Sequence, residues 1–377
     1  MTTPQTPPTH MWLPSPLPPA VATALQRLQK ADDVHHIAVM PDVHLAADVC
    51  VGIVLATTRL IYPNAVGGDI GCGMAALAFD CDASLLAHKD AANRLMAGLY
   101  QTVPTNRHPK PQPLPQTLAD YPLTHPRLES IKRRDAAVQF ATLGRGNHFL
   151  EFQSDESGRL WLMVHSGSRA IGQAIRDLHL HNARPIPAGL KAIPADTPQG
   201  QAYLSDMTFA VLYAAANRRA IIDAVANLFS SLFSTPPLPE TYLACDHNHV
   251  RSEQHFGHSL YVHRKGAIPA SLDEPGIIPG SMASESYHVA GRAHPDSLRS
   301  SSHGAGRAMS RDEARRRISP HDLARQLDGL WYDHRLAHHL RDEAPAAYKD
   351  IRAVMRAQRD LTRIVRKLTP ILCYKGA

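Results

Sequence analysis

Histidine is the side chain whose number and surroundings in this sequence point most directly to chemistry. The chain has 23 histidines among 377 residues, and several stand in short segments rich in Gly, Asn and Ser. Such segments form loops that can aim side chains into a site. A neutral imidazole binds transition metals and transfers protons near neutral pH. These segments are therefore the candidates for a catalytic or metal-binding site.

Four of these segments carry residues that can bind a metal. Residues 67–74 (GGDIGCGM) place a carboxylate and a thiol within a glycine-rich turn. Residues 144–151 (GRGNHFLE), 164–169 (VHSGSR) and 245–249 (CDHNH) add histidines, and Asn147 is a neutral donor to a phosphate oxygen. Together the segments supply O, S and N atoms for one or two divalent ions. The candidate ligands are Asp69, Cys72, His148, His165 and His247.

The alternative for each of these histidines is a structural one. A single histidine is more often hydrogen-bonded in the core than bound to a metal, with odds of roughly one in four for metal binding. Four clusters in one chain weigh against that interpretation for all of them. Their spacing is unlike that of a zinc finger, so the site must be assembled from distant segments, as catalytic sites are.

A fifth segment, residues 300–307 (SSSHGAGR), places His303 among small residues. Arg307 follows four residues later, and Ser310 with Glu313 predicts a helix start, so a phosphate beside His303 is favoured. A serine-rich loop around a buried histidine fits this pattern equally well. The sequence has neither a P-loop nor a complete dinucleotide-binding fingerprint, so any nucleotide binds by another design.

Composition limits the classes of partner and compartment. Lys and Arg exceed Asp and Glu by 40 to 34, and the resulting charge of +6 with a pI of about 9.1 permits a polyanionic partner. The five cysteines are scattered and odd in number, which favours a reducing cytoplasm over a disulfide framework. No signal peptide or membrane-spanning segment is recognisable, so we expect a cytoplasmic protein without membrane contact.

The elements that must position these residues can be predicted in outline. Seven prolines in residues 1–19 predict an extended N-terminal arm, followed by a helix over residues 20–30. Residues 37–78 read as strands broken by turns. Residues 104–126 and 185–198 are proline-rich and are expected to be surface loops, with two further strands between them.

Helices are expected in the second half of the chain. Ser205 and Asp206 offer N-caps to a helix with an apolar stripe, and Ser310 and Ser319 each begin a further helix. The last helix is predicted over residues 347–368. Its arginines face either solvent or an anion, and the sequence does not separate the two. The stripe residues are Val211, Ala215, Ile222, Val225 and Phe229, and the arginines are Arg352, Arg356, Arg359, Arg363 and Arg366.

In these motifs the chain resembles the RtcB family of RNA ligases, from about residue 37 to residue 376. The resemblance is specific because many motifs occur in the family's order. They are MPDVH (40–44), VGGDIGCGM (66–74), GRGNHFLE (144–151), HSGSR (165–169), HNHV (247–250), HRKGA (263–267), IPGSM (278–282), HGAGRAMSR (303–311), AYKDI (347–351) and KG (375–376).

The resemblance implies one large α+β domain, residues 20–377, with mixed and antiparallel β-sheets at its core and helices around them. It implies that Cys72 bridges two Mn²⁺ ions whose shells Asp69, His148, His165 and His247 complete. Mn²⁺ rests on the resemblance alone, since intrinsic affinities favour Zn²⁺ or Cu²⁺ at such a site. The residues implied to contact the nucleotide are Asn147, Glu151, Ser281, His303, Arg307, Tyr348 and Lys375.

The resemblance also implies a reaction. His303 would attack the α-phosphorus of GTP, with Asn147 and Arg307 on the phosphates, and the histidine-bound GMP would then join RNA ends. The RNA would carry a 3′-phosphate or 2′,3′-cyclic phosphate on one end and a 5′-hydroxyl on the other, as in RNA repair or tRNA splicing. A neutral imidazole is a competent nucleophile, and divalent ions neutralise phosphate charge.

The sequence leaves the RNA substrate and the type of activity open. Residues 45–48 (LAAD) replace a turn that usually contains Gly and Lys, and the chain is short, which fits a specialised paralogue for a particular damaged RNA. A guanylyltransferase that caps ends without sealing and a metal-dependent phosphodiesterase are the rival enzymes. A non-catalytic RNA-binding scaffold is the third alternative, and with 6% aromatic residues it would rely on phosphate contacts rather than base stacking.

Overall fold

Two β-sheets form the centre of the structure, a computed structural model that describes residues 6–376. The first sheet has five strands in the order β1-β2-β3-β12-β11. Only β1 and β2 pair in parallel, and β1 comes from the proline-rich N-terminal segment. The strands are β1 (Thr9–Met11), β2 (Val34–His44), β3 (Val51–Thr57), β11 (Asn248–His255) and β12 (His258–Lys265).

The second sheet has seven antiparallel strands in the order β10-β5-β7-β6-β17-β15-β14. Two small sheets, β13-β16 and β4-β9-β8, flank the large ones. The strands of the second sheet are β5 (Gly73–Asp82), β6 (Phe149–Asp155), β7 (Arg159–Ser166), β10 (Pro237–Asp246), β14 (Pro275–Ile278), β15 (Ser286–Gly291) and β17 (Thr362–Lys375). The small strands are β4 (Leu60–Ile61), β8 (Arg184–Ile186), β9 (Leu190–Pro194), β13 (Ala267–Pro269) and β16 (Ser300–Ser302).

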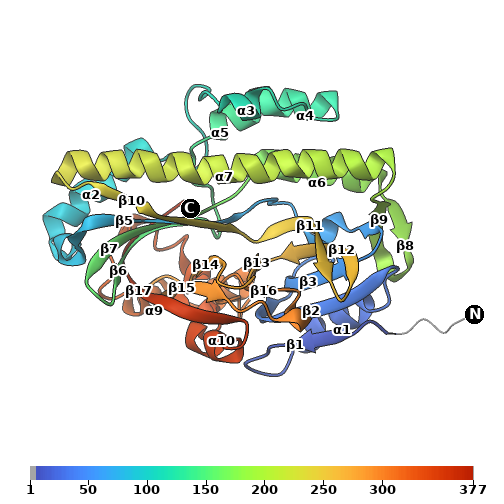
Figure 1. Cartoon of the computed structure of the whole chain (residues 1–377). Helices are drawn as coiled ribbons and strands as arrows, with labels where there is room; N and C mark the ends of the chain where they lie inside the picture. The colour runs from blue at the N-terminus through green and yellow to red at the C-terminus, as the bar shows by residue number, and fades with distance from the viewer. Residues whose placement is uncertain (1–5, 377) are drawn as a thin grey trace, which may run out of the picture.

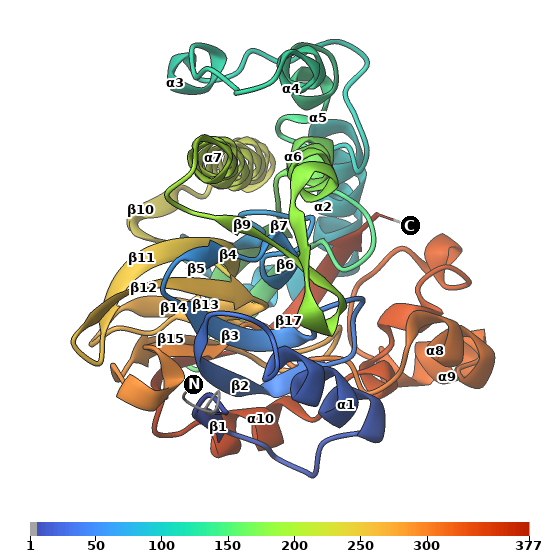
Figure 2. The same cartoon turned by 90° about the vertical axis from the view of Figure 1, so that its right-hand side faces the viewer.

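Helices cover the sheets on several sides. The long helix α7 runs across the molecule above the sheets, with α3 and α4 lying farther out (Figure 1). In the view turned by 90°, α1 and the α8–α9 pair lie at the lower right of the sheets, away from α7 at the top (Figure 2). The helices are α1 (Pro19–Leu28), α2 (Lys89–Thr102), α3 (Gln116–Ala119), α4 (Pro126–Ile131), α5 (Ala137–Gln139), α6 (Arg169–Asn182), α7 (Pro198–Phe233), α8 (Arg311–Arg317), α9 (Pro320–Gln326) and α10 (Ile351–Ala357).

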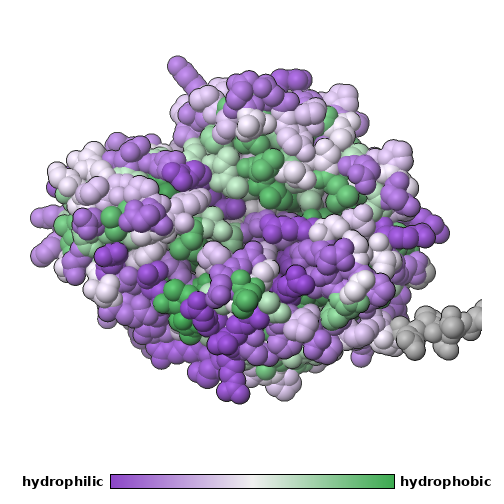
Figure 3. All heavy atoms as spheres, in the orientation of Figure 1, coloured by the Kyte–Doolittle hydropathy of each residue, from purple (hydrophilic) through white to green (hydrophobic). Residues whose placement is uncertain are grey.

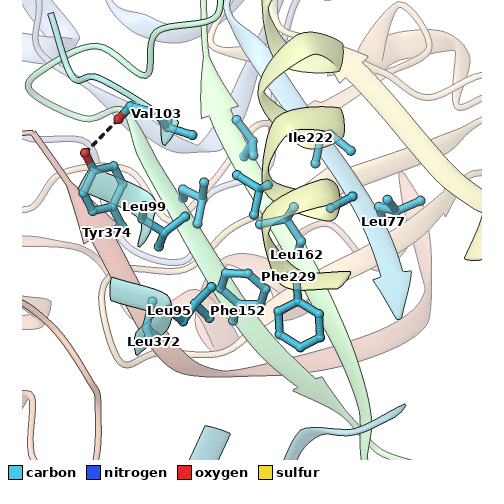
Figure 4. Close-up of a cluster of buried hydrophobic side chains, with 14 of the residues drawn as sticks. Leu77, Leu95, Leu99, Val103, Phe152, Leu162, Ile222, Phe229, Leu372 and Tyr374 are labelled. Carbon is cyan, nitrogen blue, oxygen red and sulfur yellow. Dashed lines mark hydrogen bonds between the residues drawn. The ribbon is translucent and has the colours of Figure 1, made fainter. Parts of the chain in front are cut away.

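The largest apolar cluster lies between the seven-stranded sheet and the helices α2 and α7. Phe152 and Leu162 from the sheet meet Leu99 from α2 and Phe229 from α7, and all four side chains are buried (Figure 4). Burying a side chain of this size contributes about 1.5–3 kcal/mol. The Tyr374 hydroxyl, at the end of β17, donates a hydrogen bond to the carbonyl of Val103 at 2.8 Å. The seven-stranded sheet therefore packs against α2 and α7 through a continuous buried apolar layer.

The predicted single α+β domain and the predicted strands over residues 37–78 are confirmed. The helix over residues 20–30 is confirmed as α1, and β6 and β7 are the two strands expected between the proline-rich stretches. Ser310 and Ser319 cap α8 and α9, and Ser319 forms a full capping box with Asp322. The arm boundary at residue 19 stays a prediction, although β1 joins the sheet and Trp12 is buried.

The predicted last helix over residues 347–368 is wrong. Only Ile351–Ala357 are helical, and the chain then enters β17 at Thr362. β-Branched residues within Thr362–Val365 favour the strand, which pairs with both β6 and β15. The predicted single arginine stripe therefore does not exist. The ion pairs of its members are Arg352 with Glu285 at 2.7 Å, Arg356 with Asp350 at 3.8 Å, Arg363 with Asp273 at 3.1 Å and Arg366 with Asp155 at 3.2 Å.

Two other local predictions are wrong. The helix predicted to begin at Ser205 and Asp206 begins at Pro198, where the Thr197 hydroxyl caps it by accepting from the Gly200 amide at 3.1 Å. Asp206 is instead buried within α7 and pairs with His179 at 2.8 Å. Residues 185–198 are not a plain loop, since β8 and β9 form a hairpin there. Ala215, part of the predicted apolar stripe, is exposed.

Apolar residues on the surface are scattered among polar ones over the face drawn in Figure 3. Among the described residues, no helix combines the length and the apolar character that crossing a bilayer requires.

Candidate metal centre and nucleotide cavity

Sheet pairing brings the five candidate metal ligands together. Met74, which directly follows the glycine-rich turn of Asp69 and Cys72, pairs with His165 of β7. His165 also pairs with Phe149 of β6, the residue after His148. His247 connects β10 and β11, and its amide donates to the Cys72 carbonyl at 2.8 Å. Residues separated by up to 178 positions thus meet at one end of three neighbouring strands.

The donor atoms form two groups that share one thiol. The first group is Cys72, His165 and His247, and the second is Asp69, Cys72 and His148; within each group the donor atoms lie within 4.8 Å of one another. The Cys72 Sγ is 3.3 Å from His165 Nε2 and 3.4 Å from His148 Nε2. A sulfur shared by two ligand sets is suited to bridge two ions.

The protonation of the two inner histidines fits a cation between them. His165 Nδ1 lies 3.0 Å from the Asn147 carbonyl, and His247 Nδ1 lies 3.2 Å from the Asn248 side-chain oxygen. Oxygen atoms of this kind only accept, so both Nδ1 atoms carry the proton. The two Nε2 lone pairs therefore face each other at 3.1 Å, where neither nitrogen can donate to the other. A metal ion resolves this arrangement, and the donor set suits one.

Burial makes charge unfavourable at this centre unless a cation is bound. Burial and the neighbouring Asp69 raise the pKa of the Cys72 thiol well above its usual value. Burial also lowers the pKa of His165 and of His247 well below the usual value, which keeps both imidazoles neutral. Burial opposes ionisation of Asp69, yet His148 at 2.8 Å lowers the pKa of this carboxyl. A divalent cation supplies the charge that a thiolate needs here.

Buried polar contacts hold the ligand loops in place. The guanidinium of Arg218, which α7 carries into the core, donates to the carbonyls of Gly71 at 2.7 Å and Ser166 at 3.0 Å. The Ser168 amide at the start of α6 donates to Asp69 at 3.0 Å. Gly167 allows this approach, because a Cβ there would lie 2.1 Å from the Asp69 side chain. The ligands are thus positioned by contacts that do not require a metal.

His303 lies beside the ligand groups and is oriented by Asp42. Its Nδ1 donates to Asp42 Oδ2 at 2.7 Å, and its amide donates to the same oxygen at 3.2 Å. Because the carboxylate accepts a hydrogen bond from Nδ1–H, a neutral His303 carries its proton on Nδ1 and has a free lone pair on Nε2. The ring centroid is 4.6 Å from that of His247. Gly306 lets the loop pack here, since a Cβ at its φ of +73° would lie 2.1 Å from the Asp42 carbonyl.

A cavity of about 820 Å³ lies beside His303 and the metal-ligand groups. It is within the usual size range of small-molecule sites. The cavity is lined by His165 of the metal groups and by every residue that the sequence assigns to the nucleotide. Those residues are Asn147, Glu151, Ser281, His303, Arg307, Tyr348 and Lys375.

Glu343 links the cationic residues of the cavity. It is buried, and it accepts hydrogen bonds from Tyr348 and from Lys375, both at 2.8 Å. Arg311 donates to it at 2.6 Å, and Arg307 lies 3.5 Å away. Burial opposes ionisation, but Lys375 and Arg311 outweigh it and lower the pKa of Glu343. The carboxylate thus preorganises a positive surface that can receive an anionic ligand.

Glu151 differs from Glu343 in its charge state. Burial raises the pKa of Glu151 to about 7, although hydrogen bonding from Gln153 at 2.8 Å and the nearby Lys375 both act in the opposite direction. A buried carboxylate of this kind gains from a ligand that offers it N–H donors. The Watson–Crick edge of guanine offers two such donors.

Four residues that the sequence does not predict stand at the cavity: Asp42 and Glu343 orient the side chains described above, and His44 and Lys349 line the cavity. Asp42 and His44 lie in the MPDVH motif, and Lys349 lies in the AYKDI motif, so the motifs were recognisable although the roles were not. Glu343 stands in an irregular segment after α9, where no sequence pattern marks it.

Comparison with known proteins agrees with this arrangement. A family model described as tRNA-splicing ligase RtcB matches residues 24–121 and 121–376. The RNA-splicing ligase RtcB of Escherichia coli K12 is 37% identical over 372 aligned residues, which cover 90% of each protein. The RNA-splicing ligase RtcB of Mycobacterium tuberculosis is 30% identical, covering 89% of this chain and 96% of its own. The tRNA-splicing ligase RtcB of Methanococcus maripaludis is 27% identical, covering 89% of this chain and 87% of its own.

Proposed function

The chain belongs to the RtcB family of RNA-splicing ligases, and from this premise we propose that it seals RNA in a GTP-dependent reaction. The proposed substrates are an RNA end with a 3′-phosphate or 2′,3′-cyclic phosphate and an RNA end with a 5′-hydroxyl. The proposed intermediate is a guanylate bound to His303. The proposed setting is RNA repair or tRNA splicing in the cytoplasm, which the net charge of +6 suits because RNA is a polyanion.

One observation carries this proposal. His303 lines a cavity that also contains the predicted nucleotide residues, its Nδ1 is bound to Asp42 so that Nε2 is the nitrogen left for a ligand, and the His247 ring lies 4.6 Å away. A nucleophile, a cationic anion site and a pair of ligand groups within one cavity are the parts that nucleotidyl transfer needs.

In the first step, His303 Nε2 attacks the α-phosphorus of GTP. The P–N bond forms, the bond from the α-phosphorus to the bridging oxygen breaks, and pyrophosphate leaves with the electron pair. The proton stays on His303 Nδ1, and the Asp42 carboxylate that accepts its hydrogen bond at 2.7 Å stabilises the positive charge that develops on the ring. Arg307 and Asn147 line the cavity and donate to the phosphates.

The proposed metal cofactors are two Mn²⁺ ions, which would be held by Asp69, Cys72, His148, His165 and His247. When bound, they supply positive charge that neutralises the phosphates and favours departure of the leaving group. Glu151 is proposed to accept N–H groups of the guanine, while Ser281, Tyr348 and Lys375 hold the rest of the nucleoside. This assignment predicts a preference for GTP over ATP, since adenine lacks those two donors on its Watson–Crick edge.

In the later steps, the 3′-phosphate of the RNA takes the guanylate from His303. The 5′-hydroxyl of the second RNA then attacks this activated phosphate and releases GMP. Opening of a 2′,3′-cyclic phosphate by water precedes these steps where the RNA end requires it.

The test is a joining assay with the purified protein, Mn²⁺ and GTP. One RNA carries a labelled 3′-phosphate end and the other a 5′-hydroxyl end, and the joined product is resolved by length. We expect joining with GTP, little with ATP, and none with His303→Ala. Accumulation of guanylylated ends without joining would identify a capping enzyme. Opening of cyclic phosphate ends without uptake of guanylate would identify a phosphodiesterase, and RNA binding without any reaction a scaffold.

A further inference from the structure

The cavity has a second wall that the assignment of the nucleotide leaves unused. Ser15, Pro18, Ala20 and Val21, around the start of α1, line it together with residues 43–45. These residues are small or apolar except for His44, the last residue of β2. His44 is the only titratable side chain that this wall contributes, so any proton transfer on this side of the cavity falls to it or to a bound ion.

The tautomer of His44 is fixed by the backbone. Its Nδ1 lies 3.0 Å from the Asp42 carbonyl, which only accepts, so Nδ1 carries the proton. The Nε2 atom has no hydrogen-bond partner within residues 6–376, and it is not fully buried. Since His44 lines the cavity, this lone pair is open to a ligand there.

Asp42 therefore orients two imidazoles in one cavity. Its carboxylate fixes His303, and its carbonyl fixes His44, so both rings carry a proton on Nδ1 and have Nε2 as the nitrogen left for a ligand. His303 uses its lone pair as the proposed nucleophile. The lone pair of His44 has no part in that step, but a later step has a proton to remove, that of the attacking 5′-hydroxyl.

We propose that His44 is the general base of the sealing step and binds the 5′-hydroxyl end of the acceptor RNA, an inference that rests on the proposed function above. The hydroxyl oxygen forms a bond with the phosphorus of the guanylylated 3′-end. The bond from that phosphorus to the guanylate oxygen breaks, and GMP leaves with the electron pair. The hydroxyl proton moves to Nε2 of His44 and passes from there to solvent.

The charged groups near His44 keep its ring neutral before the acceptor binds. Burial lowers the pKa of His44 to about 4, the protonated form of His303 and the Lys349 ammonium act in the same direction, and Asp42 acts against them. Lys349 is held in place by donating to the carbonyls of Pro41 at 3.0 Å and Val43 at 2.5 Å. The phosphates of bound RNA add negative charge, which moves the pKa of His44 upward, towards the range of an effective base.

The test separates the two chemical steps in the full-length protein loaded with Mn²⁺. Guanylate uptake by His303 is measured with α-labelled GTP. Sealing is measured in a single turnover, with RNA already guanylylated at its 3′-end and an excess of 5′-hydroxyl RNA, as a function of pH. The variants are His44→Asn, whose amide can still donate to the Asp42 carbonyl but provides no base, and His44→Gln. His258→Asn, which changes an exposed histidine in the β11–β12 hairpin, is the control.

We expect both His44 variants to take up guanylate within about threefold of the wild-type rate but to seal about 100-fold more slowly. Their sealing rate should rise with pH throughout the range, whereas that of the wild type levels off once His44 is neutral. Sealing by His44→Asn at the wild-type rate would overturn the inference. An equal loss of guanylate uptake would also overturn it, because His44 would then only position Asp42 and His303. If the wild-type protein neither took up guanylate nor sealed RNA, that result would instead contradict the proposed function itself.

Discussion

The hydrogen bond between Asp42 and His303 allows the sharpest prediction about the proposed nucleophile. In the wild-type protein Asp42 Oδ2 accepts from both His303 Nδ1 and the His303 amide, and Asp42 is fully buried. The substitution Asp42→Asn keeps the size of the side chain and removes its charge. The amide group can then take two orientations, and each of them impairs His303.

In the first orientation, the amide oxygen faces His303 and keeps both hydrogen bonds. A hydrogen bond to a charged group is worth about 1.5–3 kcal/mol and a neutral one about 0.5–1.5 kcal/mol, so about 1–1.5 kcal/mol is lost, or roughly tenfold in rate. The amide nitrogen then takes the place of Oδ1, which is buried without a partner, and its unpaired N–H groups cost about 1–3 kcal/mol of stability.

In the second orientation, the amide nitrogen faces His303 and donates to Nδ1. The proton of the ring then moves to Nε2, and the lone pair that attacks GTP is lost. A mixture of the two orientations gives an expected loss of about 100-fold in the rate of guanylate uptake, which corresponds to about 2.7 kcal/mol.

The assay is a rapid-quench measurement of label transfer from GTP to the protein at saturating GTP and Mn²⁺. The affinity for GTP, measured separately at equilibrium, should change little, because Asp42 does not line the cavity. Asp48→Asn, an exposed position in the loop after the same strand, is the control and should behave as the wild type. Guanylate uptake by Asp42→Asn within about twofold of wild type would refute the argument that the carboxylate sets the tautomer of His303.

Three further predictions concern the metal centre, the guanine contact and the His303 loop. Cys72→Ser should reduce bound Mn²⁺ from two ions per chain to one or none, as measured by elemental analysis after dialysis, whereas the control Cys81→Ser, at a partly buried cysteine of β5 outside the ligand groups, should leave two. Glu151→Gln should stabilise the ligand-free protein above pH 7. The pKa of Glu151 rises from 4.5 to about 7 on folding, so the folded state binds more protons than the unfolded chain between these values. The wild type therefore loses up to about 3 kcal/mol of folding stability as pH rises through this window. Equal pH dependence of the melting temperature in both proteins would contradict this. Gly306→Ala should lower both the melting temperature and guanylate uptake, because the added Cβ meets the Asp42 carbonyl, while Gly257→Ala, where no atom lies within 4 Å, should leave guanylate uptake unchanged.

The sequence predicts the site better than it predicts the elements around it. Asp69, Cys72, His148, His165 and His247 stand in short motifs of unusual composition, and local composition is visible in a sequence. The distances among them depend on the pairing of β5, β6 and β7, which no local pattern reveals. Their approach could be inferred only from the resemblance to a family.

The errors in the elements have a common physical origin. Apolar residues between Ile351 and Leu368 recur at helical spacing, but those after Leu361 belong to a strand whose stability comes from distant partners, β6 and β15. Asp206 has the residue type of an N-cap, but it is used in a buried pair with His179. In both cases a tertiary contact outweighs a local preference of at most about 1–2 kcal/mol. Glu343 has no local signal at all, and its role is apparent only from the three side chains that donate to it.

The central claim is that a neutral His303 becomes covalently guanylylated. The most direct measurement is mass spectrometry of the protein after incubation with GTP and Mn²⁺, followed by peptide mapping under conditions that preserve the P–N bond. We expect one added guanylate per chain, located on His303, absent with ATP and lost on treatment with acid. Guanylate on any other residue, or an unmodified protein that nevertheless joins RNA ends, would contradict it.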